Sequence, residues 1–132
     1  MNDRLTALKH SATWFTLIGA AAALVHYIVA VALETGAILT PSNANIVGFL
    51  CAFPVSYFGH RAFSFSTQKT SHSQAFPRFL VVACGGFLAN QLLVVSALHM
   101  TSLPFWLVLA VVMVIVAVST YILSRYWAFK AQ

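Results

Sequence analysis

Charged side chains are scarce in this chain. Of its 132 residues, 7% are charged and 61% are hydrophobic, whereas soluble domains carry about 25% charged residues. Too little charge is present to cover a surface that faces water. The composition therefore excludes a soluble domain and predicts an all-α membrane protein, because helices satisfy their own backbone hydrogen bonds in lipid.

Carboxylates are the rarest of the charged groups. Asp3 and Glu34 are the only two, and the topology predicted below puts them on opposite sides of the membrane, where they cannot act as an acid–base pair. The sequence also lacks a glycine-rich phosphate loop, a His-Glu-x2-His motif and a nucleophile with a base beside it. We therefore expect neither enzymatic activity nor a cofactor.

Cysteine is rare as well. Cys51 and Cys84 stand within apolar runs without metal-site spacing, so we interpret them as small buried hydrophobic side chains. The five histidines show no ligand spacing either, and no metal is expected. The net charge of +5 is not gathered in a basic helix or arm, so we expect anionic lipid as a partner and no nucleic acid.

Long apolar runs dominate the rest of the chain. Crossing the hydrocarbon core takes ~20 apolar residues, and four segments approach or reach this length: Thr13–Leu33, Ala44–Phe58, Phe79–Leu98 and Phe105–Leu123. Pro54 interrupts the second segment and is expected to kink it. A cleaved signal peptide ending at Ala30-Val31-Ala32 is the alternative for the first segment, which exceeds the usual ~7–15 residues of a signal core. We predict four transmembrane helices.

The basic residues define a topology. The connections 34–43 and 99–104 contain no Lys or Arg, and all seven basic residues lie on the side of the termini: Arg4, Lys9, Arg61, Lys69, Arg78, Arg125 and Lys130. The positive-inside rule places that side in the cytoplasm. We therefore expect both termini, and the polar linker Ser66–Pro77, to be cytoplasmic.

The chain contains an internal repeat. A shift of 64 residues pairs Tyr57 with Tyr121, Arg61 with Arg125, Phe65 with Phe129 and His26 with Asn90. We predict one domain, residues 1–132, built from two parallel two-helix repeats at about 13–66 and 77–130, related by an axis along the membrane normal.

Two groups of residues are candidates for a site. A guanidinium donates two parallel hydrogen bonds to a phosphate, so Arg61 and Arg125 at the helix ends are predicted to bind a lipid phosphate; the alternative is that they only set topology. We expect Tyr57 and Tyr121 to add hydroxyl donors, and four aromatic side chains to line the headgroup and isoprenoid region: Phe63, Phe65, Trp127 and Phe129.

His26 and Asn90 form the second group, within apolar helices. Small residues share their faces, including Gly19 and Gly86, which would let helices approach closely. We predict that His26 and Asn90 face the interior and help a polar headgroup pass the midplane; the alternative is that they only bond one helix to another.

The paired motifs resemble the GtrA-like family of small four-helix membrane proteins of cell-surface polysaccharide synthesis. Members close each half with a stretch like N-F-x-x-N-R-x-W-x-F. The corresponding stretches here run from Ser56 to Phe65 and from Thr120 to Phe129, with His60 and Ser124 where the family often has Asn. The match extends over nearly the whole chain and adds His60 to the lipid-phosphate site.

The resemblance implies a carrier of lipid-linked sugars. It implies binding of polyprenyl (undecaprenyl) phosphate, or of a sugar linked to it, and its movement between leaflets of the bacterial inner membrane. The alternative is a non-transporting adaptor that holds a membrane glycosyltransferase. A small multidrug-type exporter ranks third, because Glu34 lies at a helix end. Four short helices bury little surface around a long lipid, which leaves a homodimer open.

Overall fold

The computed structural model describes residues 2–64 and 71–123, with side chains described up to Ser119, apart from that of Leu8. These residues form four α-helices and one short π-helix: α1 (Asn2–Thr35), α2 (Pro41–Gly59), η1 (His60–Ser64), α3 (His72–Met100) and α4 (Phe105–Leu123). The described chain is helical without strands, as the composition predicted. Its four predicted apolar segments all lie in helices.

Within the described residues, three helical segments are long and apolar enough to cross a membrane: α1, the continuous stretch Pro41–Ser64, and α3. The apolar stretch Phe105–Ser119 of α4 is shorter. Large apolar side chains point outward from the bundle; those of Val81 and Val82, for example, are 73% and 76% exposed. An aqueous surface does not tolerate apolar patches of this extent, so the chain is a multi-pass membrane protein.

Several helix boundaries differ from the prediction. α1 begins at Asn2 rather than near Thr13, and α3 begins at His72, so the last residues of the predicted linker are helical and Pro77 lies inside a helix. The apolar run marks only the part of each helix that lipid surrounds, and a helix can continue into water beyond it. α2 begins at Pro41 rather than near Ala44, with Thr40 as the N-cap and Pro41 in the first turn, where a missing N–H costs nothing.

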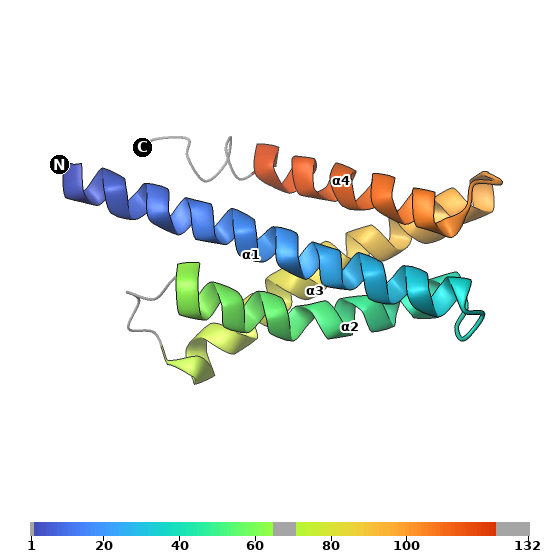
Figure 1. Ribbon diagram of the computed structural model, residues 1–132, viewed down its shortest axis with the longest axis horizontal. Helices are drawn as coiled ribbons and strands as arrows, with labels where there is room; N and C mark the ends of the chain where they lie inside the picture. The colour runs from blue at the N-terminus through green and yellow to red at the C-terminus, as the bar shows by residue number, and fades with distance from the viewer. Residues whose placement is uncertain (1, 65–70, 124–132) are drawn as a thin grey trace.

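The helices run lengthwise along one axis, and their ends define two ends of the bundle (Figure 1). We call the end with connections 36–40 and 101–104 the loop end. The opposite end holds the start of α1, η1 and the start of α3, and the close of α4 lies there too. We call it the basic end, because it carries the described Arg and Lys residues. Which end faces the cytoplasm stays a prediction, and so does the relation between the two repeats.

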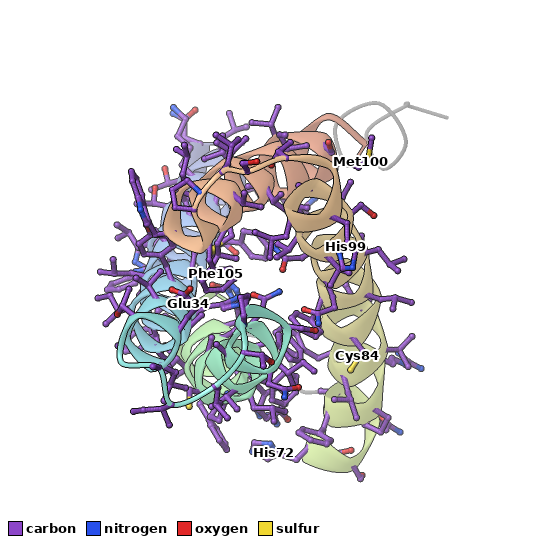
Figure 2. The ribbon with its side chains drawn as sticks, turned by 90° about the vertical axis from the view of Figure 1, so that its right-hand side faces the viewer. Glu34, His72, Cys84, His99, Met100 and Phe105 are labelled. Carbon is purple, nitrogen blue, oxygen red and sulfur yellow. The ribbon has the colours of Figure 1, made fainter. Side chains whose placement is uncertain are left out.

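All four helices pack together near the loop end, whereas α3 and α4 separate from each other toward the basic end. The buried apolar core lies near the loop end and consists of Ala30, Ala44, Val94, Phe105, Val108, Leu109 and Val112. α3 and α4 meet at the loop end and diverge from there (Figure 1). Viewed from the loop end, Met100 lies next to α4, while His72 lies far from it (Figure 2). The bundle is therefore closed by its core at one end and widens toward the other.

Glycine brings α1 and α2 together. A Cβ added at Gly48 would lie 2.6 Å from the carbonyl oxygen of His26, and one added at Gly59 would lie 2.6 Å from Cγ2 of Ile18. Both distances are too short for any residue with a side chain. Two other predictions about small residues were wrong. Nothing lies within 4 Å of a Cβ added at Gly19 or Gly86, so neither brings helices into contact.

The cysteines were also mispredicted. Cys51 and Cys84 are exposed on the outside of the bundle rather than buried in it. A bilayer reverses the usual inference, because an apolar side chain in a membrane helix gains nothing by facing the protein interior instead of lipid.

Candidate functional site

A pocket of about 530 Å³ opens at the basic end, and we call it the basic pocket. It is formed by α1, α2, η1 and α3, with the lining residues Phe15, Ser56, Tyr57, His60, Arg61, Ala75, Arg78, Phe79, Val82 and Ala83. Two guanidinium groups, those of Arg61 and Arg78, contribute to the lining, and no carboxylate does among the described residues. A cationic pocket with aromatic walls suits an anionic group attached to an apolar chain.

His72 holds two of the predicted site residues in place. Its Nε2 accepts a hydrogen bond from Nε of Arg61 at 3.0 Å, which leaves Nδ1 of the neutral ring to donate to the hydroxyl of Tyr57 at 2.9 Å. His72 is the first residue of α3, whereas Tyr57 lies near the end of α2 and Arg61 lies in η1. The start of α3 therefore orients the guanidinium and the phenol across the linker.

His60 is part of the pocket wall. Its side chain is buried, with Nδ1 3.1 Å from Oγ of Ser64, and its ring stacks on Phe15 at a centroid distance of 4.5 Å. The hydroxyl of Ser11 in turn donates to the carbonyl oxygen of Ser64 at 2.6 Å. η1 is thus bonded to α1, which fixes the side of the basic pocket opposite α3.

The predicted aromatic wall differs from the observed one. Phe63 stacks on Trp14 at 4.7 Å and does not belong to the lining residues of the basic pocket; Phe15 and Phe79 do. The other three predicted members of the wall, Phe65, Trp127 and Phe129, lie outside the described residues. Arg125, which was predicted to bind the lipid phosphate, lies outside them too. Tyr121 lies in α4, but its side chain is outside the described part as well.

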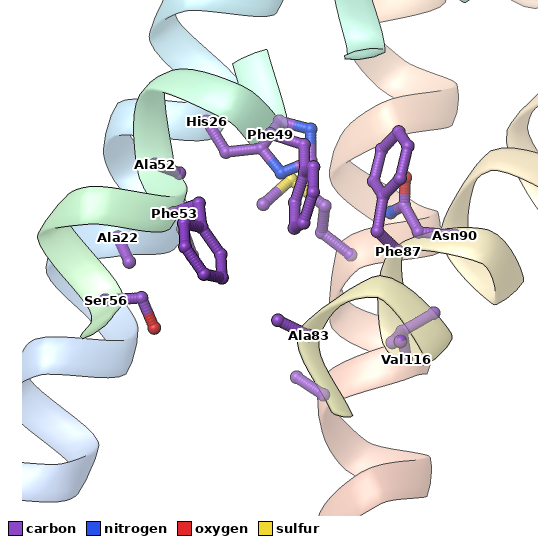
Figure 3. Close-up of a pocket in the computed structure, with 14 residues that line it drawn as sticks. Ala22, His26, Phe49, Ala52, Phe53, Ser56, Ala83, Phe87, Asn90 and Val116 are labelled. Atoms are coloured by element: carbon purple, nitrogen blue, oxygen red, sulfur yellow. The ribbon is translucent and has the colours of Figure 1, made fainter. Parts of the chain in front are cut away.

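A second pocket of about 250 Å³ lies deeper in the bundle, and we call it the deep pocket (Figure 3). His26 of α1 and Asn90 of α3, the two polar residues predicted to face the interior, both line it. Ser56 and Ala83 line both pockets, so the deep pocket adjoins the basic pocket. Gly86 belongs to the deep lining too, which explains why its missing side chain leaves space instead of a helix contact.

A buried polar network begins at His26 and continues toward the loop end. Oδ1 of Asn45 lies 2.7 Å from Nε2 of His26, and Nδ2 of Asn45 donates to Oδ1 of Asn90 at 2.9 Å and to Oε1 of Gln91 at 2.7 Å. Nε2 of Gln91 donates to Oγ of Ser42 at 2.7 Å. We call the four residues Ser42, Asn45, Asn90 and Gln91 the amide clamp. It bonds α2 to α3.

An aromatic column runs beside both pockets along the contact of α2 with α3. Phe49 stacks on Phe87 at a centroid distance of 4.3 Å, Phe53 lies 5.7 Å from Phe79, and Tyr57 lies 5.5 Å from the same Phe79 ring. The three α2 residues are spaced by four, so they share one helix face. This column supplies an apolar surface from the basic end to the middle of the bundle.

Several of these residues were missed by sequence reasoning. Asn45 and Gln91 are polar residues in apolar segments, which is a signal of function or of helix pairing in membranes, and Asn45 is fully buried. Arg78 was counted only as a topology signal. No pattern in the sequence could pair His72 with Arg61, because the two residues belong to different helices and sequence spacing does not fix how those helices meet. The described residues contain no cluster of three or more His, Cys, Asp or Glu side chains suited to a metal.

Comparison with known proteins gives one match. A sequence model of the GtrA/DPMS transmembrane domain matches residues 14–129, a range that includes both pockets and the amide clamp. Searches of curated proteins and of solved structures returned no match.

Proposed function

Because this chain belongs to the GtrA/DPMS transmembrane domain family, which points to membrane glycan and polysaccharide synthesis, we propose that it is a carrier for lipid-linked sugars. In this proposal it binds polyprenyl (undecaprenyl) phosphate, or a sugar linked to it, and moves the headgroup between leaflets. It makes and breaks no covalent bond.

The observation that carries the proposal is the adjacency of two chemically different pockets. The basic pocket offers the guanidinium groups of Arg61 and Arg78, and a charge-assisted hydrogen bond to phosphate contributes about 1.5–3 kcal/mol. The deep pocket offers neutral polar groups from His26, Ser56 and Asn90, which suit the hydroxyl groups of a sugar. A phosphate at the first pocket would place its attached sugar toward the second, through the shared edge at Ser56 and Ala83.

The aromatic column provides an apolar surface that the isoprenoid chain of the ligand can contact. The aromatic column of Phe49, Phe53 and Tyr57 runs from the basic pocket along the deep pocket. Isoprene units are apolar and contact aromatic rings favourably, while the polar headgroup stays between the helices. In this arrangement the lipid chain remains in the bilayer as the headgroup moves.

The direction of approach follows from charge. The described basic residues lie at one end of the bundle, and the positive-inside rule places that end in the cytoplasm of a bacterial inner membrane. The basic pocket then opens to the cytoplasmic leaflet, where a lipid-linked sugar would enter. Both termini would be cytoplasmic.

Two measurements on the purified protein test the proposal. Mass spectrometry in mild detergent would detect a co-purified polyprenyl phosphate or its glycosyl derivative. Vesicles of phosphatidylethanolamine and phosphatidylglycerol that contain the protein should then move a labelled polyprenyl phosphate-linked hexose across the bilayer faster than empty vesicles. A co-purified glycosyltransferase without such a lipid, and without transport, would support the adaptor instead; the same spectra would show a homodimer.

A further inference from the structure

The amide clamp separates the deep pocket from the loop end. We infer that it is a gate, which opens when hydroxyl groups of a headgroup in the deep pocket take over its hydrogen bonds. This inference rests on the proposed carrier function, and it adds a route from the deep pocket to the loop end together with a condition for opening it.

The position of the clamp fits a gate. Ser42 lies in the first turn of α2 at the loop end, and Arg61 lies 19 residues further along, a separation of ~28 Å at 1.5 Å per helical residue. Asn90 belongs both to the clamp and to the lining of the deep pocket. The clamp therefore begins where the deep pocket ends and continues to the opposite end of the bundle from the basic pocket.

The clamp is sealed by packing. Asn45, Val94 and Leu109 are the largest side chains that are fully buried among the described residues, and Val94 and Leu109 belong to the apolar core at the loop end. In this structure the route is thus accessible from the basic end and closed at the loop end. A carrier needs a second state that is open at the loop end and closed at the basic end.

The hydrogen bonds of the clamp can be replaced by hydrogen bonds to a sugar. Both hydrogens of the Asn45 amide are used, one by Asn90 and one by Gln91, and its oxygen is paired with His26. Separating α2 from α3 would leave the amide hydrogens of Asn45 and their acceptors on Asn90 and Gln91 unpaired in apolar surroundings, which is unfavourable. Hydroxyl groups both donate and accept, so a sugar beside Asn90 can satisfy the separated amides. The phosphate alone cannot, because it stays with the guanidinium groups at the other end.

Within each helix pair, by contrast, the contacts are mainly apolar. α1 is bound to α2 by close contact at Gly48 and Gly59, and α4 packs on α3 through the core at the loop end. Movement of one helix pair against the other would break the hydrogen bonds of the clamp and, at the basic end, those of His72 to Tyr57 and Arg61. The hydroxyl of Tyr27, which donates to the carbonyl oxygen of Trp106 at 3.0 Å, is a further contact between the pairs at the loop end.

A reversible cross-link tests the gate. In a background with Cys51→Ala and Cys84→Ala, the double variant Ser42→Cys with Gln91→Cys places two thiols on facing helices, which mercuric ion can bridge and a dithiol can release. With the bridge formed, we expect binding of a polyprenyl phosphate-linked hexose from the basic end within about threefold of the unbridged protein, and transport reduced by at least about tenfold. The two single variants treated with mercuric ion are the controls.

Accessibility of a single thiol gives a second test, which remains if the double variant fails to assemble. A membrane-impermeant maleimide added at the loop end should label Gln91→Cys several-fold faster with the hexose-linked lipid than with polyprenyl phosphate. Undiminished transport with the bridge confirmed by mass spectrometry, or equal labelling with both lipids, would overturn the gate. Absence of lipid binding in the unmodified protein would instead remove the proposed function itself.

Discussion

Nε of Arg61 donates to Nε2 of His72 at 3.0 Å, across a linker that joins η1 to α3. This bond connects Arg61, one of the two arginines predicted from the sequence to bind phosphate, to a histidine that was not predicted to take part. It sets the direction of a guanidinium at the opening of the basic pocket. The start of α3 is thereby part of the site, although its residues appeared to belong to a polar connection.

Replacing His72 should therefore weaken binding through Arg61. His72→Phe keeps a ring but removes both hydrogen bonds, to Arg61 and to Tyr57. Loss of the bond that orients Arg61, worth about 0.5–1.5 kcal/mol, predicts polyprenyl phosphate binding weaker by roughly twofold to tenfold. His99→Phe is the matched control, since His99 bonds to Val95 of its own helix at the loop end. Equal affinities of the two variants in a lipid-binding titration would contradict a positioning role.

The arginines should not be replaceable by lysine. Arg61→Lys and Arg78→Lys keep the charge, and so the topology signal, but lose the planar fork that grips phosphate. Each change should weaken binding by about 10–150-fold, the equivalent of one charge-assisted bond. Arg125→Lys carries the same prediction from the repeat, and Arg4→Lys is the control at the same end of the bundle. Wild-type affinity in the Arg61, Arg78 and Arg125 variants would show that these arginines only set the topology.

Two glycines that look equivalent in sequence should respond differently to alanine. Gly48→Ala puts a methyl group against the backbone of His26, and such overpacking costs typically 1–3 kcal/mol. Gly86→Ala meets nothing within 4 Å, so it should leave the unfolding temperature in detergent unchanged while narrowing the deep pocket. A thermal unfolding comparison decides this, and equal loss of stability would show that α3 packs more closely than described.

The charge of the sugar should matter. His26, Ser56 and Asn90 supply polar groups to the deep pocket, and no arginine or lysine lines it among the described residues. Burying a carboxylate without a partner is costly, so a lipid-linked uronic acid should bind at least about tenfold more weakly than the matching hexose. Competition titrations with the two lipids measure the ratio, and a ratio near one would place the sugar outside the deep pocket.

Reporter fusions test the orientation. Reporters placed within 36–40 or 101–104 should be active only outside the cytoplasm, and those after Gln132 only inside it, because all seven basic residues lie on one side. A mixed population at any site would instead support the exporter, whose relatives insert both ways.

The sequence by itself determined the class of protein and much of the basic end. Scarce charge and long apolar runs required helices in lipid, because an unpaired backbone is too costly there. Tyr57, His60 and Arg61 share one turn of helix, so their spacing alone placed them together. His26 and Asn90 were identified as interior residues because polar groups in lipid need partners, and both are buried in the structure.

The tertiary structure decided which of these groups meet. Asn45 bonds to Asn90 and Gln91, and Arg61 shares its pocket with Arg78, because α3 crosses α2 at one particular angle and rotation. Sequence spacing fixes neighbours within a helix but not the rotation of one helix against another. In lipid that rotation is poorly encoded by apolar patterning, since apolar faces are equally stable toward lipid and toward protein. The hydrogen bonds of a few buried polar side chains therefore specify how the helices are rotated against one another, which the apolar pattern does not.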